Sequence, residues 1–84
     1  MEFMIVAIKD RLSGRFMQPI FVENEDTAKR WFKHVLDTTE IFKDNKGDFE
    51  LYRLGRFDDE VGVYSNWDKE LLADGQGVAH ERTE

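Results

Sequence analysis

Apolar residues occupy nearly every position near the start of the chain. Over residues 3–10, one alternating set is Phe3, Ile5 and Ala7, and the other is Met4, Val6 and Ile8. A strand that is apolar on both faces is typical of the centre of a sheet that is covered on both sides. The pattern therefore predicts a central strand over residues 3–10.

A second strand is predicted directly after the first. Ser13 and Gly14 are turn residues, and the segment 15–23 again favours a strand. The short connection indicates a β-hairpin. Pro19 has no N–H group to donate to a neighbouring strand, so we expect this second strand to lie at an edge or to carry a bulge.

The middle of the chain changes to a helical period. Asn24 is a favourable N-cap, and the acids that follow it suit the first turn, where the helix dipole favours anions. The next apolar residues recur at intervals of three and four and form one stripe: Ala28, Trp31, Phe32, Val35 and Leu36. We expect a helix from residue 25 to about residue 37. A loop over 41–48 should follow, attached to the core by Ile41 and Phe42.

Two further strands are predicted over 49–57 and 61–65, with Gly55 as a bulge position. Between them lies a run of carboxylates, Asp58, Asp59 and Glu60. A hairpin tip is expected here, and Asp is common in such turns. Carboxylates also bind Mg²⁺ or Ca²⁺, but three consecutive ones rarely converge on one ion. The turn is the favoured interpretation, and we expect no metal site.

Together these elements predict a single α+β domain over residues 1–67. Two β-hairpins form an antiparallel sheet, and one amphipathic helix packs on one face (ββαββ). Residues 68–84 contain few bulky apolar side chains and many charges, which predicts an acidic, flexible C-terminal tail.

Composition narrows the classes of function. The 84 residues contain 12 Lys and Arg against 18 Asp and Glu, a net charge of −6, and residues 57–84 carry all of the excess. There is no cysteine, no phosphate-binding glycine loop and no nucleophile with an identifiable base. We therefore expect no enzymatic activity and no cofactor. No apolar run is long enough for a transmembrane helix, so we expect a soluble intracellular protein with no membrane partner.

Two groups of cations are candidates for contacts with nucleic-acid phosphates. Lys29, Arg30 and Lys33 lie on the solvent stripe of the predicted helix. Arg53 and Arg56 lie on a strand beside Tyr52, whose ring could stack on a base. In a regular strand these two arginines point to opposite faces. A merely solvated helix face is the alternative, because acids stand four residues away in Glu25–Lys29, Asp26–Arg30 and Lys33–Asp37.

The string FELYRLGRFDDEVGVY, preceded by a helix with AKRWF, resembles the small non-structural protein of gokushoviruses, microviruses with single-stranded DNA genomes. The resemblance spans residues 4–64, although Val61 stands where that family usually has threonine. The matching positions are Ile8, Asp10, Pro19, Ile20, Phe21, Arg30, Trp31, Phe32, Asp48, Leu51, Tyr52, Leu54, Gly55, Phe57, Asp58 and Gly62. It implies a phage protein that is made in the host cytoplasm and is absent from the virion. It also implies an accessory role in replication or packaging of single-stranded viral DNA, through DNA binding.

A second class of function stays open. The aromatic residues and the acidic tail also suit a protein–protein interaction module that binds a host or viral replication or assembly protein. We further expect a homodimer, because one helix covers only one face of the sheet and the strand over 3–10 is apolar on both faces. The alternative cover is the loop 38–48, folded over the second face in a monomer.

Overall fold

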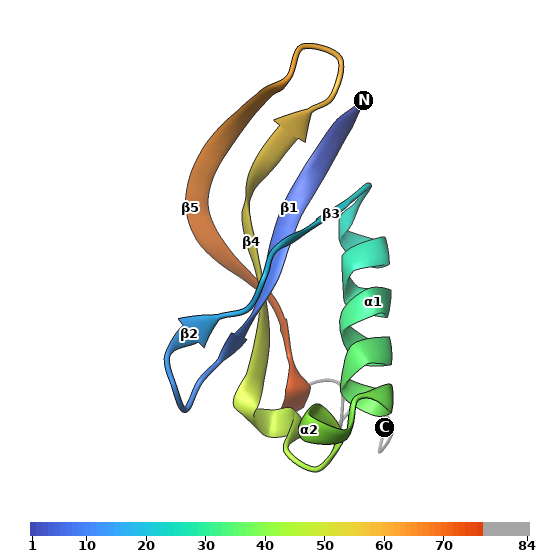
Figure 1. The fold of residues 1–84 in the computed structure, drawn as a ribbon, viewed down its shortest axis with the longest axis vertical. Helices are drawn as coiled ribbons and strands as arrows, with labels where there is room; N and C mark the ends of the chain where they lie inside the picture. The colour runs from blue at the N-terminus through green and yellow to red at the C-terminus, as the bar shows by residue number, and fades with distance from the viewer. Residues whose placement is uncertain (77–84) are drawn as a thin grey trace.

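A five-stranded antiparallel sheet and one long helix make up the protein (Figure 1). The computed structural model describes residues 1–76, apart from the side chain of Trp67. The strands are β1 (Glu2–Asp10), β2 (Arg15–Phe16), β3 (Ile20–Val22), β4 (Phe49–Asp58) and β5 (Val63–Asp74). The helices are α1 (Glu25–Thr38), α2 (Glu40–Lys43) and the 3₁₀ turn η1 (Lys46–Asp48). The predicted α+β class is confirmed.

Strand β1 is central, as predicted. It pairs with β4 on one side and with both β2 and β3 on the other. The predicted strand over 15–23 is therefore present as two short pieces along one edge of the sheet. The break between them contains Pro19, which cannot donate to β1 and is tolerated because an edge strand needs only one partner.

Helix α1 begins where the capping signal predicts. The side chain of Asn24 accepts a hydrogen bond from the Thr27 N–H at 2.8 Å. The helix buries Ala28, Phe32 and Leu36 completely against one face of the sheet. The core residues that these three join are Val6, Ile8, Val22, Phe42, Phe49 and Leu51. This packing, rather than local propensity, provides most of the stability of a helix of this length.

Strand β5 is longer than the segment 61–65 that the sequence predicted. It continues to Asp74, so residues 68–74, which we assigned to the tail, form its second half. Their pairing with β4 runs down to Glu50 opposite Asp74. An edge strand can be this polar because backbone hydrogen bonds to its neighbour hold it, and its charges discourage further pairing. Residues 77–84 of the predicted tail lie outside the described residues.

The segment after α1 lies at the end of the helix and not over the second face of the sheet (Figure 1). Phe42 is buried and packs edge-on against Phe49, with ring centroids 4.5 Å apart. Ile41 is 70% exposed, so only one of the two predicted anchors reaches the core. The structure therefore does not show the predicted alternative in which loop 38–48 folds over the second face of the sheet.

An extra residue in β4 changes which way its arginines point. The pairing of β1 with β4 shifts between Ile5 opposite Gly55 and Val6 opposite Arg53, which leaves Leu54 as the extra residue of a bulge. Arg56 lies opposite Met4, and Arg53 lies opposite Val6, so both share the face that α1 covers. Arg53 and Arg56 would point to opposite faces in a regular strand, and the bulge places them on the same face.

Candidate functional site on the open face of the sheet

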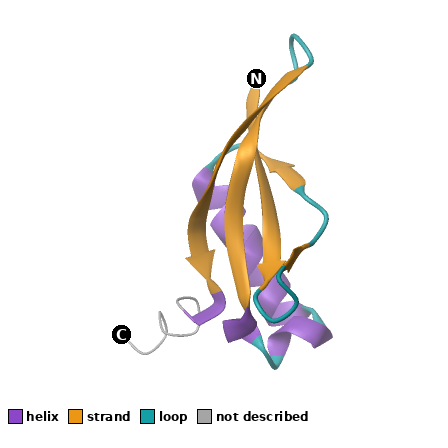
Figure 2. Ribbon diagram, turned by 90° about the vertical axis from the view of Figure 1, so that its left-hand side faces the viewer, coloured by secondary structure: helices purple, strands orange, loops and turns teal. Residues whose placement is uncertain are grey.

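Helix α1 covers one face of the sheet, and no other element in residues 1–76 covers the opposite one (Figure 2). We call this second surface the open face. Residues that pair across strands point the same way. The pairs Phe3 with Phe57, Ile5 with Phe21, and Lys9 with Phe16 therefore all belong to the open face.

Two aromatic rings and a lysine come together at one end of the open face. Phe16 and Tyr52 meet edge-to-face, with ring centroids 5.5 Å apart. The Lys9 Nζ atom lies 5.7 Å from the Phe16 centroid and 5.8 Å from that of Tyr52, within cation–π range. We call these three residues the aromatic–lysine cluster. They come from β1, β2 and β4, so only the register of the sheet brings them together.

The environment of the cluster keeps its tyrosine neutral. Loss of hydration raises the pKa of the Tyr52 hydroxyl above its ordinary value, and the nearby Glu50 carboxylate raises it further. The positive charge of Arg11, whose Nη1 donates to the Gly47 carbonyl at 3.0 Å, opposes this shift in part. The cluster thus presents two uncharged rings beside the cation Lys9, with Glu50 and Asp74 in the same cross-strand row as Lys9.

A shallow apolar groove occupies the rest of the open face. Its volume is about 360 Å³, and its lining residues are Ile5, Pro19, Phe21, Leu54, Phe57, Tyr64 and Asn66. The rings of Phe21 and Phe57 are stacked at a tilt, 5.2 Å apart. Phe21 is 52% exposed and Tyr64 is 64% exposed, which is unusual for large apolar side chains gathered on one surface. No lysine or arginine lines the groove.

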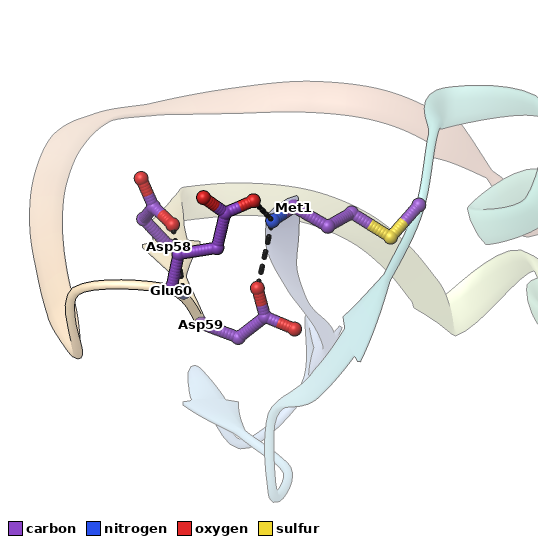
Figure 3. Close-up of polar contacts among 4 residues, drawn as sticks. All are labelled: Met1, Asp58, Asp59 and Glu60. Carbon is purple, nitrogen blue, oxygen red and sulfur yellow. Dashed lines mark hydrogen bonds and ion pairs between the residues drawn. The ribbon is translucent and has the colours of Figure 1, made fainter.

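The β4–β5 turn forms an acidic tip beyond the groove, consisting of Asp58, Asp59 and Glu60. Asp58 Oδ1 accepts the Glu60 N–H at 2.9 Å, and Gly62 adopts a left-handed φ of 70°, so the predicted hairpin turn is confirmed. The other two carboxylates converge on the Met1 amine, at 2.7 Å for Asp59 and 3.1 Å for Glu60 (Figure 3). In the described part of the chain, no three or more acidic or histidine side chains are arranged to hold a metal ion.

We predict that the Met1 amine titrates above its ordinary pKa of 8.0. Its hydrogen bonds to Asp59 and then Glu60 favour the charged form. Any stability from this contact is present below pH 8.0 and is lost as the pH rises through the higher pKa of the folded state. An NMR titration of the Met1 resonances should show a lower pKa in Asp59→Asn. An unchanged pKa in that variant would contradict the contact.

The predicted helix cations, Lys29, Arg30 and Lys33, lie on α1 and not on the open face. Lys29 is paired with Glu25 at 2.9 Å, as the spacing predicted. Asp37, the predicted partner of Lys33, instead accepts Lys46 at 2.6 Å. Arg30 is exposed and Lys33 is half-buried. These cations are therefore separated from the aromatic–lysine cluster by the full thickness of the sheet and helix.

The two arginines of β4 that the sequence predicted as phosphate contacts both form ion pairs with acidic side chains. Arg53 forms an ion pair with Glu70 of β5, and its side chain is only 19% exposed. Arg56 donates to Glu2 at 2.7 Å and is about half exposed. Of the predicted nucleic-acid residues, only Tyr52 lies on the open face. Its neighbours Lys9 and Phe16 were missed, although Lys9 continues the alternation of Phe3, Ile5 and Ala7 along β1.

The structure defines the class of protein as a small α+β domain. Its sheet is covered by a helix on one face and exposes aromatic side chains on the other. A family model described as "Phage ORF5 protein" matches residues 3–78, so the chain belongs to this phage protein family. No curated protein and no solved structure gives a match. None of the helices within residues 1–76 combines the length and apolar character needed to cross a membrane.

Proposed function

We propose that this phage protein is a non-structural accessory factor in the replication or packaging of single-stranded viral DNA, and that it binds the strand on the open face. The aromatic–lysine cluster carries this proposal. Sequence-independent binding of single strands combines rings on which bases stack with cations that track the phosphates. Phe16 and Tyr52 supply the rings, and Lys9 lies against both of them.

The aromatic–lysine cluster is exposed, so a DNA strand can reach its rings from the solvent. Phe16 is 37% exposed, Tyr52 is half-buried, and no described segment lies over them. A flat surface of this kind suits unpaired bases, because a duplex keeps its bases stacked and out of reach. Membership of a phage family and the resemblance to gokushovirus proteins agree with this role. We therefore also propose that the protein acts in the host cytoplasm and is absent from the virion.

The overall charge sets the expected strength of binding. A net charge of −6 repels DNA at long range, so the local cations act at close contact only. We expect weak binding that falls steeply as salt is raised. The acidic tip directs the strand toward the opposite end of the open face, where Lys9 lies against the two rings.

Fluorescence anisotropy with a labelled oligothymidylate tests the proposal at about 50 mM salt. Replacing Phe16 by alanine removes one stacking ring and should weaken binding about 5- to 150-fold. Tyr64→Ala is the matched control, since Tyr64 is an exposed ring of the same face that lies in the apolar groove. We expect its affinity to stay near that of the parent protein.

Variants of the helix cations separate the two candidate surfaces. If Arg30→Gln and Lys33→Gln weaken binding while Phe16→Ala does not, the strand contacts α1 and the open-face site is wrong. If the parent protein shows no binding at high micromolar concentration in low salt, DNA binding itself is wrong.

A protein–protein interaction module is the second candidate function, and the apolar groove is the observation that favours it. The groove has no cation among its lining residues and exposes aromatic side chains, as protein interfaces do. Pull-down from infected cells after nuclease treatment separates the two functions. Partners that disappear with nuclease support DNA, whereas a replication or assembly protein that is retained by the parent and lost with Phe21→Asp supports this alternative.

A further inference from the structure

One row of side chains crosses the open face at the aromatic–lysine cluster and carries charges of both signs. In order from β2 to β5, the row consists of Phe16, Lys9, Glu50 and Asp74. Residues that pair in this way point to the same face of the sheet. Lys9 is the cation of the row, and both acids lie on its β4 and β5 side. The row is therefore positive toward β2 and negative toward β5.

Lys9 and Glu50 lie opposite each other in the row but do not form an ion pair. Within residues 1–76, neither side chain takes part in any ion pair, although both are half-buried. Lys9 instead lies over the rings of Phe16 and Tyr52. In the same part of the chain, the Glu50 side chain accepts a single hydrogen bond, a long one of 3.4 Å from the Tyr52 hydroxyl. Both charged groups therefore keep free hydrogen-bonding capacity beside the two rings.

The order of charges in the row restricts how a single strand can lie on the cluster. Phosphates are attracted to Lys9 and repelled by Glu50 and Asp74. The sugar–phosphate backbone is therefore favoured on the β2 side of the row. A base that stacks on the rings then extends from that side toward β4. Glu50 consequently faces the edge of the base and not a phosphate.

A carboxylate in this position distinguishes among the four bases. An ionised carboxylate accepts hydrogen bonds and donates none. Guanine, cytosine and adenine each carry an amino group that donates, whereas thymine has no amino group and presents carbonyl oxygens. In guanine a ring N–H lies next to the amino group, so the two oxygens of one carboxylate can accept two hydrogen bonds from one base. Guanine therefore matches a carboxylate best, and thymine matches it least.

We propose that the aromatic–lysine cluster recognises the base that stacks on it, with a preference for guanine over thymine, and that Glu50 is the specificity-determining residue. Lys9 holds the neighbouring phosphate, and the Glu50 carboxylate accepts from the ring N–H and the amino group of guanine. This inference rests on the proposed function, because it assumes that a base stacks on Phe16 or Tyr52.

Anisotropy competition against a labelled oligothymidylate in low salt tests the preference. The competitors are short oligothymidylates whose central base is thymine, guanine, cytosine or adenine, and a single guanine avoids the association of guanine runs. We expect the guanine competitor to bind at least about 5-fold more tightly than the thymine competitor, the lower end of what a bidentate base contact provides. Cytosine and adenine, which offer the amino group alone, should lie between them.

Glu50→Gln is the informative variant, because glutamine has nearly the same shape but no charge and one carbonyl acceptor in place of two oxygens. The guanine preference should disappear, while the affinity for oligothymidylate should not fall, since a repulsive carboxylate is removed. A merely structural role of Glu50 would instead lower the affinity for all four competitors together. Asp74→Asn is the matched control, because it removes the same charge one strand further along the row. It should leave the guanine preference in place.

The outcomes separate this inference from the proposed function. If the four competitors bind equally well to the parent protein, the base preference is wrong and the proposed function stands. A guanine preference that persists in Glu50→Gln, or that Asp74→Asn also abolishes, overturns the role of Glu50. If no oligonucleotide binds at all, the proposed function fails, and the base preference fails with it.

Discussion

Replacing Phe32 by alanine is expected to remove most of the stability of the protein. Phe32 is fully buried and is among the largest side chains in the core, where α1 meets the sheet. Truncating a buried phenylalanine typically costs about 3–5 kcal/mol, because apolar contacts are lost and a cavity remains. Small domains have about 5–15 kcal/mol in total and tend toward the lower end of that range.

Urea unfolding followed by far-ultraviolet circular dichroism measures this loss. Ile41→Ala is the control, since Ile41 is a large apolar residue that is 70% exposed. The control should unfold close to the midpoint of the parent protein. A shift below about 1 kcal/mol for Phe32→Ala would mean that α1 does not pack on the sheet as described.

The second large effect is expected at Gly55, beside the bulge of β4. A Cβ atom added at this position would lie 2.3 Å from the carbonyl oxygen of Ser65 in β5. That oxygen belongs to the backbone of a paired strand, so β4 and β5 must separate to make room. We expect Gly55→Ala to cost about 1–3 kcal/mol, as overpacking of a filled site does.

Gly14→Asn is the matched control for this glycine effect. Gly14 lies in the turn between β1 and β2, its φ of 74° is one that asparagine tolerates, and nothing lies within 4 Å of an added Cβ. Urea unfolding should show a small change for Gly14→Asn and a large one for Gly55→Ala. Amide resonances of Ser65 and Asn66 should also move in Gly55→Ala, and unchanged resonances would contradict the close approach.

The parts of the fold that local pattern determines could be predicted from the sequence. Asn24 and the apolar stripe of α1 act within one helix, and the alternation in β1 acts within one strand. The turns at Gly14 and at the acidic tip depend on a few adjacent residues. Each of these signals is complete within a short segment, and each appears in the structure where it was expected.

Features that depend on pairing between distant segments could not be predicted in the same way. The second half of β5 has little apolar alternation of its own and is ordered by β4, which is formed elsewhere in the chain. The sequence predicted a bulge at Gly55, but the extra residue is the neighbouring Leu54, and only the register with β1 defines that position. The bulge reverses the direction of every side chain beyond it. The faces of Arg53 and Arg56 depend on that one extra residue.

The candidate site combines both kinds of feature. Tyr52 was a predicted site residue because an aromatic ring lies among arginines in the sequence. The structure instead places it with Phe16 and Lys9, which are distant from it along the chain. Only the hairpin register and the central position of β1 bring the three together. The helix cations were identified from the spacing of residues along the helix. That spacing carries no information on their distance from the exposed aromatic rings.

The central claim is that single-stranded DNA binds to the open face of the sheet. An NMR titration tests this claim most directly. Backbone amides of ¹⁵N-labelled protein are followed while oligothymidylate is added in low salt. The account predicts shifts centred on Lys9, Phe16 and Tyr52, with much smaller changes along α1. Shifts confined to Lys29, Arg30 and Lys33, or no shifts at any DNA concentration, would contradict it.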